Sequence, residues 1–208
     1  MKKYPSKKKI KVWRERLRFA GSAFMGSFKK ISYVASIIAV VILATSSVGC
    51  SSASGAGHSV GSGNDTWWTT YPAQSPGFGS EVKHPSWVLD ALTNKPVVVY
   101  VHKGCDYCKP QTDAMAEVMK EYGDKFTYYD IPADGSDARA EQALQAYDPN
   151  GGITYVPMTI IVTLAPDSSG KVQVVWHSTE EVTGKAWIED YVKDAISYYN
   201  ENSASWKK

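Results

Sequence analysis

Cysteine is scarce in this chain, and charge is missing from one long segment. Only three cysteines occur among the 208 residues, at Cys50, Cys105 and Cys108. Three thiols are too few for a disulfide-dense scaffold, so the fold depends on a hydrophobic core, for which this length is sufficient. No Asp, Glu, Lys or Arg lies between Ile31 and Asn64. The chain also lacks a nucleotide-binding motif, and no nucleotide or other cofactor is expected. It contains no internal repeats.

The charges that are present lie unevenly on the two sides of this uncharged segment. Residues 1–30 hold eleven Lys and Arg and a single acid, Glu15, although the formal net charge of the whole chain is only +2. A basic arm, an uncharged stretch and a mildly acidic domain are three different parts of one chain. A basic arm can bind nucleic acid. The apolar segment that follows favours a different interpretation, in which the basic residues stay in the cytoplasm and hold a membrane segment in place. No nucleic-acid partner is therefore expected.

Residues 31–49 are interpreted as a transmembrane segment or a signal sequence. A helix of this length reaches roughly 28 Å, which is close to the ~30 Å thickness of a bilayer's hydrocarbon core. Its most apolar part, residues 37–44, is also short enough for the central region of a signal peptide. Both interpretations keep the N-terminus in the cytoplasm. The folded part is therefore expected to be extracytoplasmic and anchored to the membrane.

The residues before Cys50 indicate how the protein could be attached to the membrane. Ser47-Val48-Gly49-Cys50 resembles the lipobox of secreted lipoproteins, in which the cysteine becomes the lipidated first residue, although Ser47 stands where that family usually has Leu. Lipidation of Cys50 would explain why one cysteine is left over beside a pair. A lipid-anchored protein, an uncleaved membrane anchor and a released protein all stay open.

Two segments separate the anchor from the folded domain. Residues 50–64 are rich in Ser and Gly and are interpreted as a flexible tether, with His58 as a polar linker residue. Residues 65–84 contain Trp67 and Trp68 but also several Pro and Gly residues, so they predict an irregular aromatic extension. This extension either packs against the domain or forms a substrate-facing aromatic surface.

The domain itself is predicted to cover residues 85–200, with a tail at 201–208. A short helix is expected up to Leu92, and residues 96–101 are a run without polar alternation, which predicts a strand buried on both faces. After the cysteines, apolar residues recur at helical spacing up to Tyr122, and Gly123 follows as a terminator. Further along, the patterns predict a strand at 126–130, a helix from Asp137 to Tyr147, a hairpin of 158–164 with 171–177, and a final amphipathic helix.

Cys105 and Cys108 lie where the buried strand meets the following helix. A C-x-x-C pair in this position is typical of a thioredoxin-like redox motif, because backbone N–H groups and the helix dipole stabilise a thiolate there. Cys108 lies seven residues before Met115 and so falls on the apolar stripe, whereas Cys105, at the expected helix start, faces outward. Cys105 is therefore predicted to attack and Cys108 to resolve. The flanking residues expected to tune the pair are Lys103, Asp106, Tyr107 and Lys109, of which the lysines favour a thiolate and Asp106 opposes it.

The predicted order strand–helix–strand–helix–strand–strand–helix resembles the thioredoxin superfamily over roughly residues 85–200. Two motifs carry this resemblance, namely Gly104-Cys105-Asp106-Tyr107-Cys108-Lys109 and Val156-Pro157-Met158-Thr159. The resemblance implies an α/β fold with a central mixed sheet flanked by helices, a redox-active Cys105–Cys108 disulfide, and a cis-proline at Pro157 beside it. It also implies protein disulfide or dithiol substrates and a membrane or extracytoplasmic redox partner that resets the pair.

Some positions depart from thioredoxin proper. Gly104 stands where thioredoxin has Trp, and Asp106-Tyr107 replaces Gly-Pro between the cysteines. Val99 and Phe126 occupy the expected positions of the buried aspartate and lysine that assist proton transfer. The best interpretation is a thiol–disulfide oxidoreductase, expected to act as a reductant. Two alternatives stay open: a binding module with a structural disulfide, or a metal site formed by His102 with the two cysteines.

Overall fold

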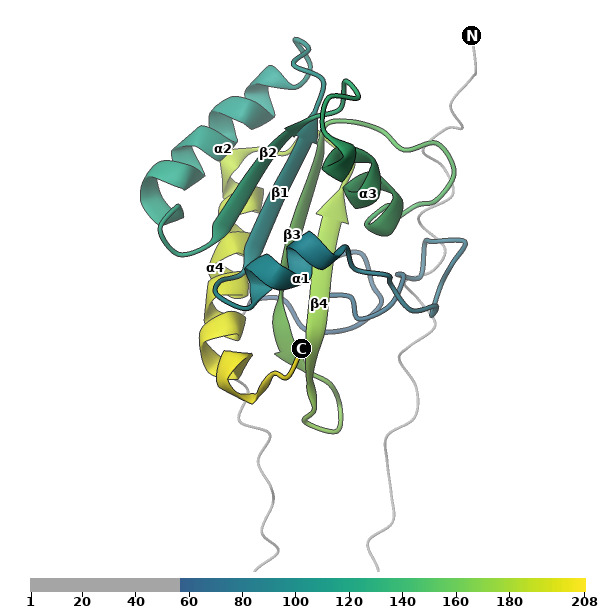
Figure 1. The fold of residues 1–208 in the computed structure, drawn as a ribbon, viewed down its shortest axis with the longest axis vertical. Helices are drawn as coiled ribbons and strands as arrows, with labels where there is room; N and C mark the ends of the chain where they lie inside the picture. Colours follow the sequence, from purple (N-terminus) through teal and green to yellow (C-terminus); the bar gives the residue numbers. More distant parts are fainter. Residues whose placement is uncertain (1–56) are drawn as a thin grey trace, which may run out of the picture. The chain divides into compact units, whose positions relative to one another are not determined.

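The computed structural model describes residues 57–208, and the geometry below concerns this part of the chain (Figure 1). The predicted basic arm, the predicted membrane segment and Cys50 lie outside the described residues. Within residues 57–208, every helix is too short or too polar to cross a bilayer.

A four-stranded mixed sheet forms the centre of the domain. Its strands are β1 (Val97–His102), β2 (Thr127–Pro132), β3 (Met158–Pro166) and β4 (Val172–Thr179). They lie in the order β2-β1-β3-β4, with β1 and β2 parallel and β3 antiparallel to both β1 and β4. The α/β fold with a mixed sheet, which the resemblance to the thioredoxin superfamily implied, is thereby confirmed.

Strand β1 is central because its residues are apolar on both faces. Its first five residues are fully buried, as the absence of polar alternation predicted. Val97 and Val99 join the core on one face of the sheet, whereas Val98 and Tyr100 join the core on the other. This strand therefore holds its C-terminal end, where the cysteines follow, in a fixed place between two packed layers.

Two helices cover each face of the sheet. Helices α1 (Ser86–Leu92) and α3 (Ala138–Ala146) contribute to the core that contains Val97, whereas α2 (Lys109–Tyr122) and α4 (Lys185–Asn202) contribute to the core that contains Val98. All four predicted helices are present, although α2 begins later than predicted. Gly123 follows α2, and the Asp137 carboxylate accepts a hydrogen bond from the Arg139 N–H at the start of α3 (2.9 Å). A short 3₁₀ turn, Ser203–Ser205, follows α4.

The aromatic extension packs against the open edge of the sheet. The backbones of Trp68 and Trp176 exchange two hydrogen bonds, at 2.8 and 2.9 Å, which adds an antiparallel bridge beside β4. Trp67 and Trp68 are at most 1% exposed. These two indoles consequently belong to the core and do not form a substrate-facing surface.

The residues just before this extension are also held in place. The Asp194 carboxylate on α4 accepts hydrogen bonds from the backbone N–H groups of Gly57 (2.7 Å) and His58 (2.8 Å), and His58 Nδ1 lies 2.6 Å from the same carboxylate. The His58 ring stacks on Tyr191, with 4.1 Å between centroids. The expectation that His58 is only a polar linker residue is therefore wrong, because a buried carboxylate on a distant helix binds it.

Candidate active site

The two cysteines lie on a tight turn that joins β1 to α2. The Cys108 N–H donates to the Cys105 carbonyl oxygen at 2.9 Å, and Cys108 is the N-cap residue of α2. The helix itself begins at Lys109, so Cys105 does not open it as the sequence predicted. The difference arises because residues 105–108 form a turn of their own, which Gly104 enters with a positive φ of 65°.

The sulfur atoms of this turn differ sharply in exposure. Cys105 is exposed, whereas Cys108 is 1% exposed. Both are free thiols, and their Sγ atoms lie 2.7 Å apart. A molecule approaching from solvent can reach Cys105, and the buried Cys108 sulfur lies in contact with the Cys105 sulfur.

The turn stabilises negative charge on the Cys108 sulfur. Burial by itself raises the pKa of the Cys108 thiol. Hydrogen bonds from the Cys105 thiol and from the backbone of Lys103, Cys105 and Gly104 outweigh burial, so this pKa lies below its usual value. Backbone groups of the turn thus favour a thiolate within the pair.

A buried tyrosine on β1 hydrogen-bonds to the turn. The Tyr100 hydroxyl donates to the Cys108 carbonyl oxygen at 3.1 Å and lies 3.0 Å from the Thr112 hydroxyl. Burial raises the pKa of Tyr100, and negative charge on either cysteine raises it further. Tyr100 therefore stays a hydrogen-bond donor under the cysteines. Sequence reasoning missed it because an aromatic residue in a buried strand looks like ordinary core.

A histidine and an aspartate lie at the entrance to the turn. His102 Nε2 is 2.7 Å from Asp130 Oδ1, and the Gly104 N–H donates to His102 Nδ1 at 3.0 Å. The histidine comes from the last residue of β1 and the aspartate from β2. The sequence indicated His102 only as a possible tuning or metal-binding group, and Asp130 was not singled out.

The charged residues around the turn are exposed, and one of them is engaged elsewhere. The Lys109 ammonium forms an ion pair with Asp113 at 2.8 Å, on the solvent side of α2. Lys103 and Asp106 are exposed, and Tyr107 is 82% exposed. Lys109 thus supports the thiolate less than the sequence indicated, because the Asp113 carboxylate offsets part of its charge.

Pro157 lies at the same end of the sheet as the cysteines. The Val156–Pro157 peptide bond is cis, as predicted. Met158, the next residue, pairs with Val101 of β1, so the register places Pro157 beside the end of β1. Gln111, in the first turn of α2, links this helix to β3. Its side-chain amide contacts the Thr159 hydroxyl and accepts a hydrogen bond from the Thr183 N–H (3.2 Å).

The residues of this end do not form a metal site. In the described part of the chain, no three His, Cys, Asp or Glu residues are grouped so that they could hold a metal ion. Both ring nitrogens of His102 already have partners in Asp130 and Gly104. A metal bound by this histidine and the two cysteines would have to displace one of these two contacts.

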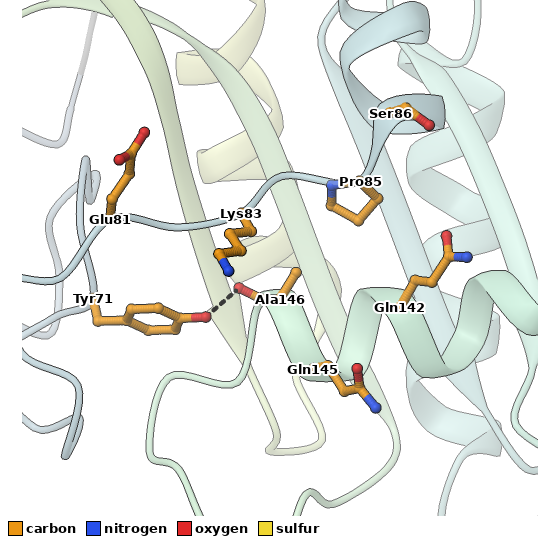
Figure 2. A pocket seen from close by; sticks show the side chains of 8 residues that line it. All are labelled: Tyr71, Glu81, Lys83, Pro85, Ser86, Gln142, Gln145 and Ala146. Atoms are coloured by element: carbon orange, nitrogen blue, oxygen red, sulfur yellow. Dashed lines mark hydrogen bonds between the residues drawn. The ribbon is translucent and has the colours of Figure 1, made fainter.

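A larger hollow lies away from the cysteines. It has a volume of about 610 Å³ and lies between the extension and α3, where the Tyr71 hydroxyl donates to the Ala146 carbonyl oxygen at 3.2 Å (Figure 2). Its lining includes Lys83, Glu81 and Gln142, and neither cysteine contributes to it. The two cysteines are therefore not part of this hollow.

Comparison with known proteins gives only distant likenesses. No protein-family model matches the chain, and no curated protein sequence does. A solved structure described only as a malarial protein is 15% identical over 49% of this chain and 98% of its own, with a TM-score of 0.34. A thioredoxin-family thiol:disulfide interchange protein from Chlorobium tepidum TLS is 21% identical over 51% and 83%, with a TM-score of 0.36.

Chloroplastic thioredoxin z is a further such neighbour, 18% identical over 51% of this chain and 85% of its own, with a TM-score of 0.35. Two of the three neighbours are thus thioredoxin-family proteins by description. Likenesses of this strength carry no weight for mechanism. The thioredoxin-like fold rests instead on the strand order, the two helices on each face and the position of the C-x-x-C turn.

Proposed function

We propose that this protein is a membrane-tethered, extracytoplasmic thiol–disulfide oxidoreductase that exchanges disulfides with protein substrates through Cys105 and Cys108. One observation supports the proposal above the others. An exposed sulfur and a buried sulfur lie 2.7 Å apart, and backbone groups around them lower the pKa of the Cys108 thiol. An exchange reaction needs one sulfur that a substrate can reach and a second sulfur in contact with it, and the lowered pKa favours the Cys108 thiolate that resolves the mixed disulfide.

The proposed reaction has two steps. The Cys105 thiolate attacks a substrate disulfide, so a mixed disulfide forms and one substrate thiolate leaves. The Cys108 sulfur then attacks Cys105 Sγ, the Cys105–Cys108 disulfide forms, and the second substrate thiolate leaves. The substrate disulfide is reduced by two electrons and the two cysteines are oxidised, while their two protons pass to the released thiolates through solvent.

The pair must be reset after each turnover. No second redox-active cysteine pair lies elsewhere in the chain, whose third cysteine is Cys50. A membrane or extracytoplasmic redox partner is therefore part of the proposal. The proposed direction is reduction of substrates, because the acidic Asp106 directly follows Cys105, whose sulfur must carry negative charge.

The tether is proposed from the sequence of residues 1–64. The basic arm and the uncharged segment support an exported domain, and the residues around Cys50 support a lipid anchor. The surface on which the cysteines lie would then face the extracytoplasmic compartment, where disulfides persist.

Single-cysteine variants test the proposed reaction. Cys108→Ser leaves the exposed attacking sulfur but removes the resolving one, so mixed disulfides with substrate proteins should accumulate on non-reducing gels. Cys105→Ser leaves only a sulfur that is 1% exposed, and it should trap at least tenfold less. The double variant is the matched control for adducts through Cys50.

Two results would contradict the proposal. Equal trapping by both single variants would remove the assigned division of roles. A wild-type pair that neither forms a disulfide in oxidised glutathione nor opens with dithiothreitol would remove the redox function altogether.

A further inference from the structure

His102 and Asp130 form a connection between the cysteine turn and the neighbouring strand. Asp130 pairs with Tyr100 in the parallel register of β1 and β2, so its side chain lies beside the last residues of β1. His102 Nε2 is 2.7 Å from its carboxylate. The other ring nitrogen, Nδ1, accepts the Gly104 N–H at 3.0 Å, one residue before Cys105. A single imidazole thus joins β2 to the backbone that carries the attacking sulfur.

These contacts determine where the imidazole carries its proton. Nδ1 must offer a lone pair, because its partner is a backbone N–H. A neutral ring with a free lone pair on Nδ1 carries its hydrogen on Nε2, and that hydrogen points to the Asp130 carboxylate. The carboxylate therefore selects the ring form that can hold Gly104.

The ring is also held against rotation. It stacks on the ring of Tyr100 with 4.8 Å between centroids and 17° between planes. Tyr100 is itself fully buried, and its hydroxyl donates to the Cys108 carbonyl oxygen. The turn is consequently held near both ends, by His102 at Gly104 and by Tyr100 at Cys108.

The hydrogen bond from the Gly104 N–H to His102 has the same geometry as a turn that asparagine commonly forms. In an Asx-turn, the side-chain oxygen of Asn or Asp accepts the N–H two residues further on. His102 Nδ1 accepts from the residue two positions on in the same way, and Gly104 takes the positive φ of 65° that follows. Histidine differs from asparagine because its second nitrogen reaches Asp130 as well.

We propose that the His102–Asp130 pair is a positioning unit for the cysteine turn, which holds Gly104 so that the Cys105 and Cys108 sulfurs stay in contact. This inference rests on the proposed function, because it assigns the pair a role in thiol–disulfide exchange. His102 touches neither sulfur through a hydrogen bond in the structure, so it acts through the backbone of Gly104.

The expected consequence is a change in the stability of the Cys105–Cys108 disulfide. Two sulfurs held in contact react with each other at a high effective concentration, which favours the intramolecular disulfide. Loss of the Gly104 contact loosens the turn and lowers that concentration. The equilibrium constant for disulfide formation against glutathione should then fall about 3- to 10-fold, the range expected for one hydrogen bond.

Two substitutions of the same residue separate this role from general stability. His102→Asn puts an oxygen where Nδ1 lies and keeps the Gly104 contact. Its equilibrium constant for disulfide formation should therefore stay within about twofold of the wild-type value. His102→Gln puts its amide where Nε2 lies, so it can reach Asp130 but lacks the acceptor for Gly104. This variant should show the 3- to 10-fold fall. Both replacements are polar and of similar size, so neither leaves a large cavity.

Asp130 provides a second test of the same connection. Asp130→Ala should lower the constant in the wild-type background, because the ring then loses the partner that fixes its orientation. In the His102→Asn background it should add nothing, since asparagine does not reach Asp130. His84→Gln is the matched control, because His84 is likewise half-buried and hydrogen-bonded, 3.0 Å from the Tyr147 hydroxyl, but lies outside the cysteine turn.

The measurement is the fraction of oxidised domain in glutathione buffers, followed by alkylation of free thiols, with unfolding in urea measured in parallel. Equal constants for His102→Gln and the wild type would overturn the positioning role, and so would equal shifts in His102→Asn and His102→Gln. Failure of the proposed function looks different. In that case the wild-type pair itself would not respond to the glutathione ratio.

Discussion

Asp106 and Lys109 flank the two sulfurs in the sequence, but their charges act differently in the structure. Asp106 is exposed within the turn, whereas the Lys109 ammonium lies 2.8 Å from the Asp113 carboxylate. A negative charge near the Cys105 sulfur disfavours the thiolate and hence the reduced state. Of the two cations that the sequence placed against this effect, Lys109 is paired with Asp113, whereas Lys103 is exposed.

Asp106→Asn should therefore make the pair more oxidising. An exposed charge pair is worth about 1 kcal/mol or less once solvent and salt screen it, which corresponds to about 20 mV for a two-electron couple. Lys109→Gln should shift the potential by less than half of this, in the opposite direction. The measurement is equilibration with glutathione buffers at low and at physiological ionic strength.

The wild-type potential itself decides the direction of electron flow. A reductant should lie near the value of about −270 mV found for thioredoxin, and far from the value of about −120 mV found for a strong periplasmic oxidant. A potential near the second value would contradict the reductant proposal. A more reducing Asp106→Asn variant would contradict its electrostatic explanation.

At the scale of elements, the aromatic extension is held to the domain by two histidines, of which His177 is buried and His84 half-buried. His177 on β4 contacts the Thr66 carbonyl oxygen with Nδ1 at 2.8 Å, and His84 of the extension contacts the Tyr147 hydroxyl at the end of α3. Burial lowers the pKa of both histidines to about 4. Each ring is thus neutral in the folded protein at neutral pH.

This depression of the pKa predicts acid destabilisation. In the unfolded chain a histidine takes up its proton near pH 6.5, whereas these two take it up near pH 4 when folded. The stability from the neutral rings is fully present above about pH 6.5 and is lost as the pH falls towards 4. Between these values each histidine should lower the free energy of unfolding by up to about 1.4 kcal/mol per pH unit.

Urea unfolding at pH 7, 6 and 5 checks this prediction, since few carboxylates titrate above pH 5. His177→Gln and His84→Gln should each flatten the dependence on pH, even where they lower stability at pH 7. A slope as steep in both variants as in the wild type would show that other groups cause the acid sensitivity.

For the whole molecule, the distribution of charge predicts on which side of a membrane the cysteines act. The basic residues 1–30 precede a segment without charged residues, which is the order expected of a protein whose later part is exported. Protease added to intact cells or spheroplasts should therefore digest the domain, and a cytoplasmic protein serves as the control. Full protection of the domain would contradict export.

Lipid attachment is tested by a separate experiment. If Cys50 is lipidated, Cys50→Ala should abolish incorporation of labelled fatty acid while leaving the redox behaviour of the other two cysteines unchanged. Labelling that persists in this variant would place the lipid elsewhere.

The local pattern of the sequence was enough to determine the elements and their order. β-branched residues without polar alternation predicted β1, and the spacing of Met115, Val118 and Tyr122 predicted α2. The cis bond at Val156–Pro157 was expected from the resemblance to the thioredoxin superfamily. The predictions of β1 and α2 succeeded because burial on both strand faces and helical spacing depend on neighbours within a few residues.

The contacts that complete the site were decided only by the tertiary structure. His102 meets Asp130 across 28 residues because the register of β1 and β2 brings them together, and Asp194 meets His58 across 136 residues because α4 packs beside the extension. Nothing in the local pattern encodes such a pairing, since strand register depends on the whole core. The sequence by itself therefore predicted which two cysteines lie together where β1 meets α2, and the tertiary structure decided which side chains hold that turn in place.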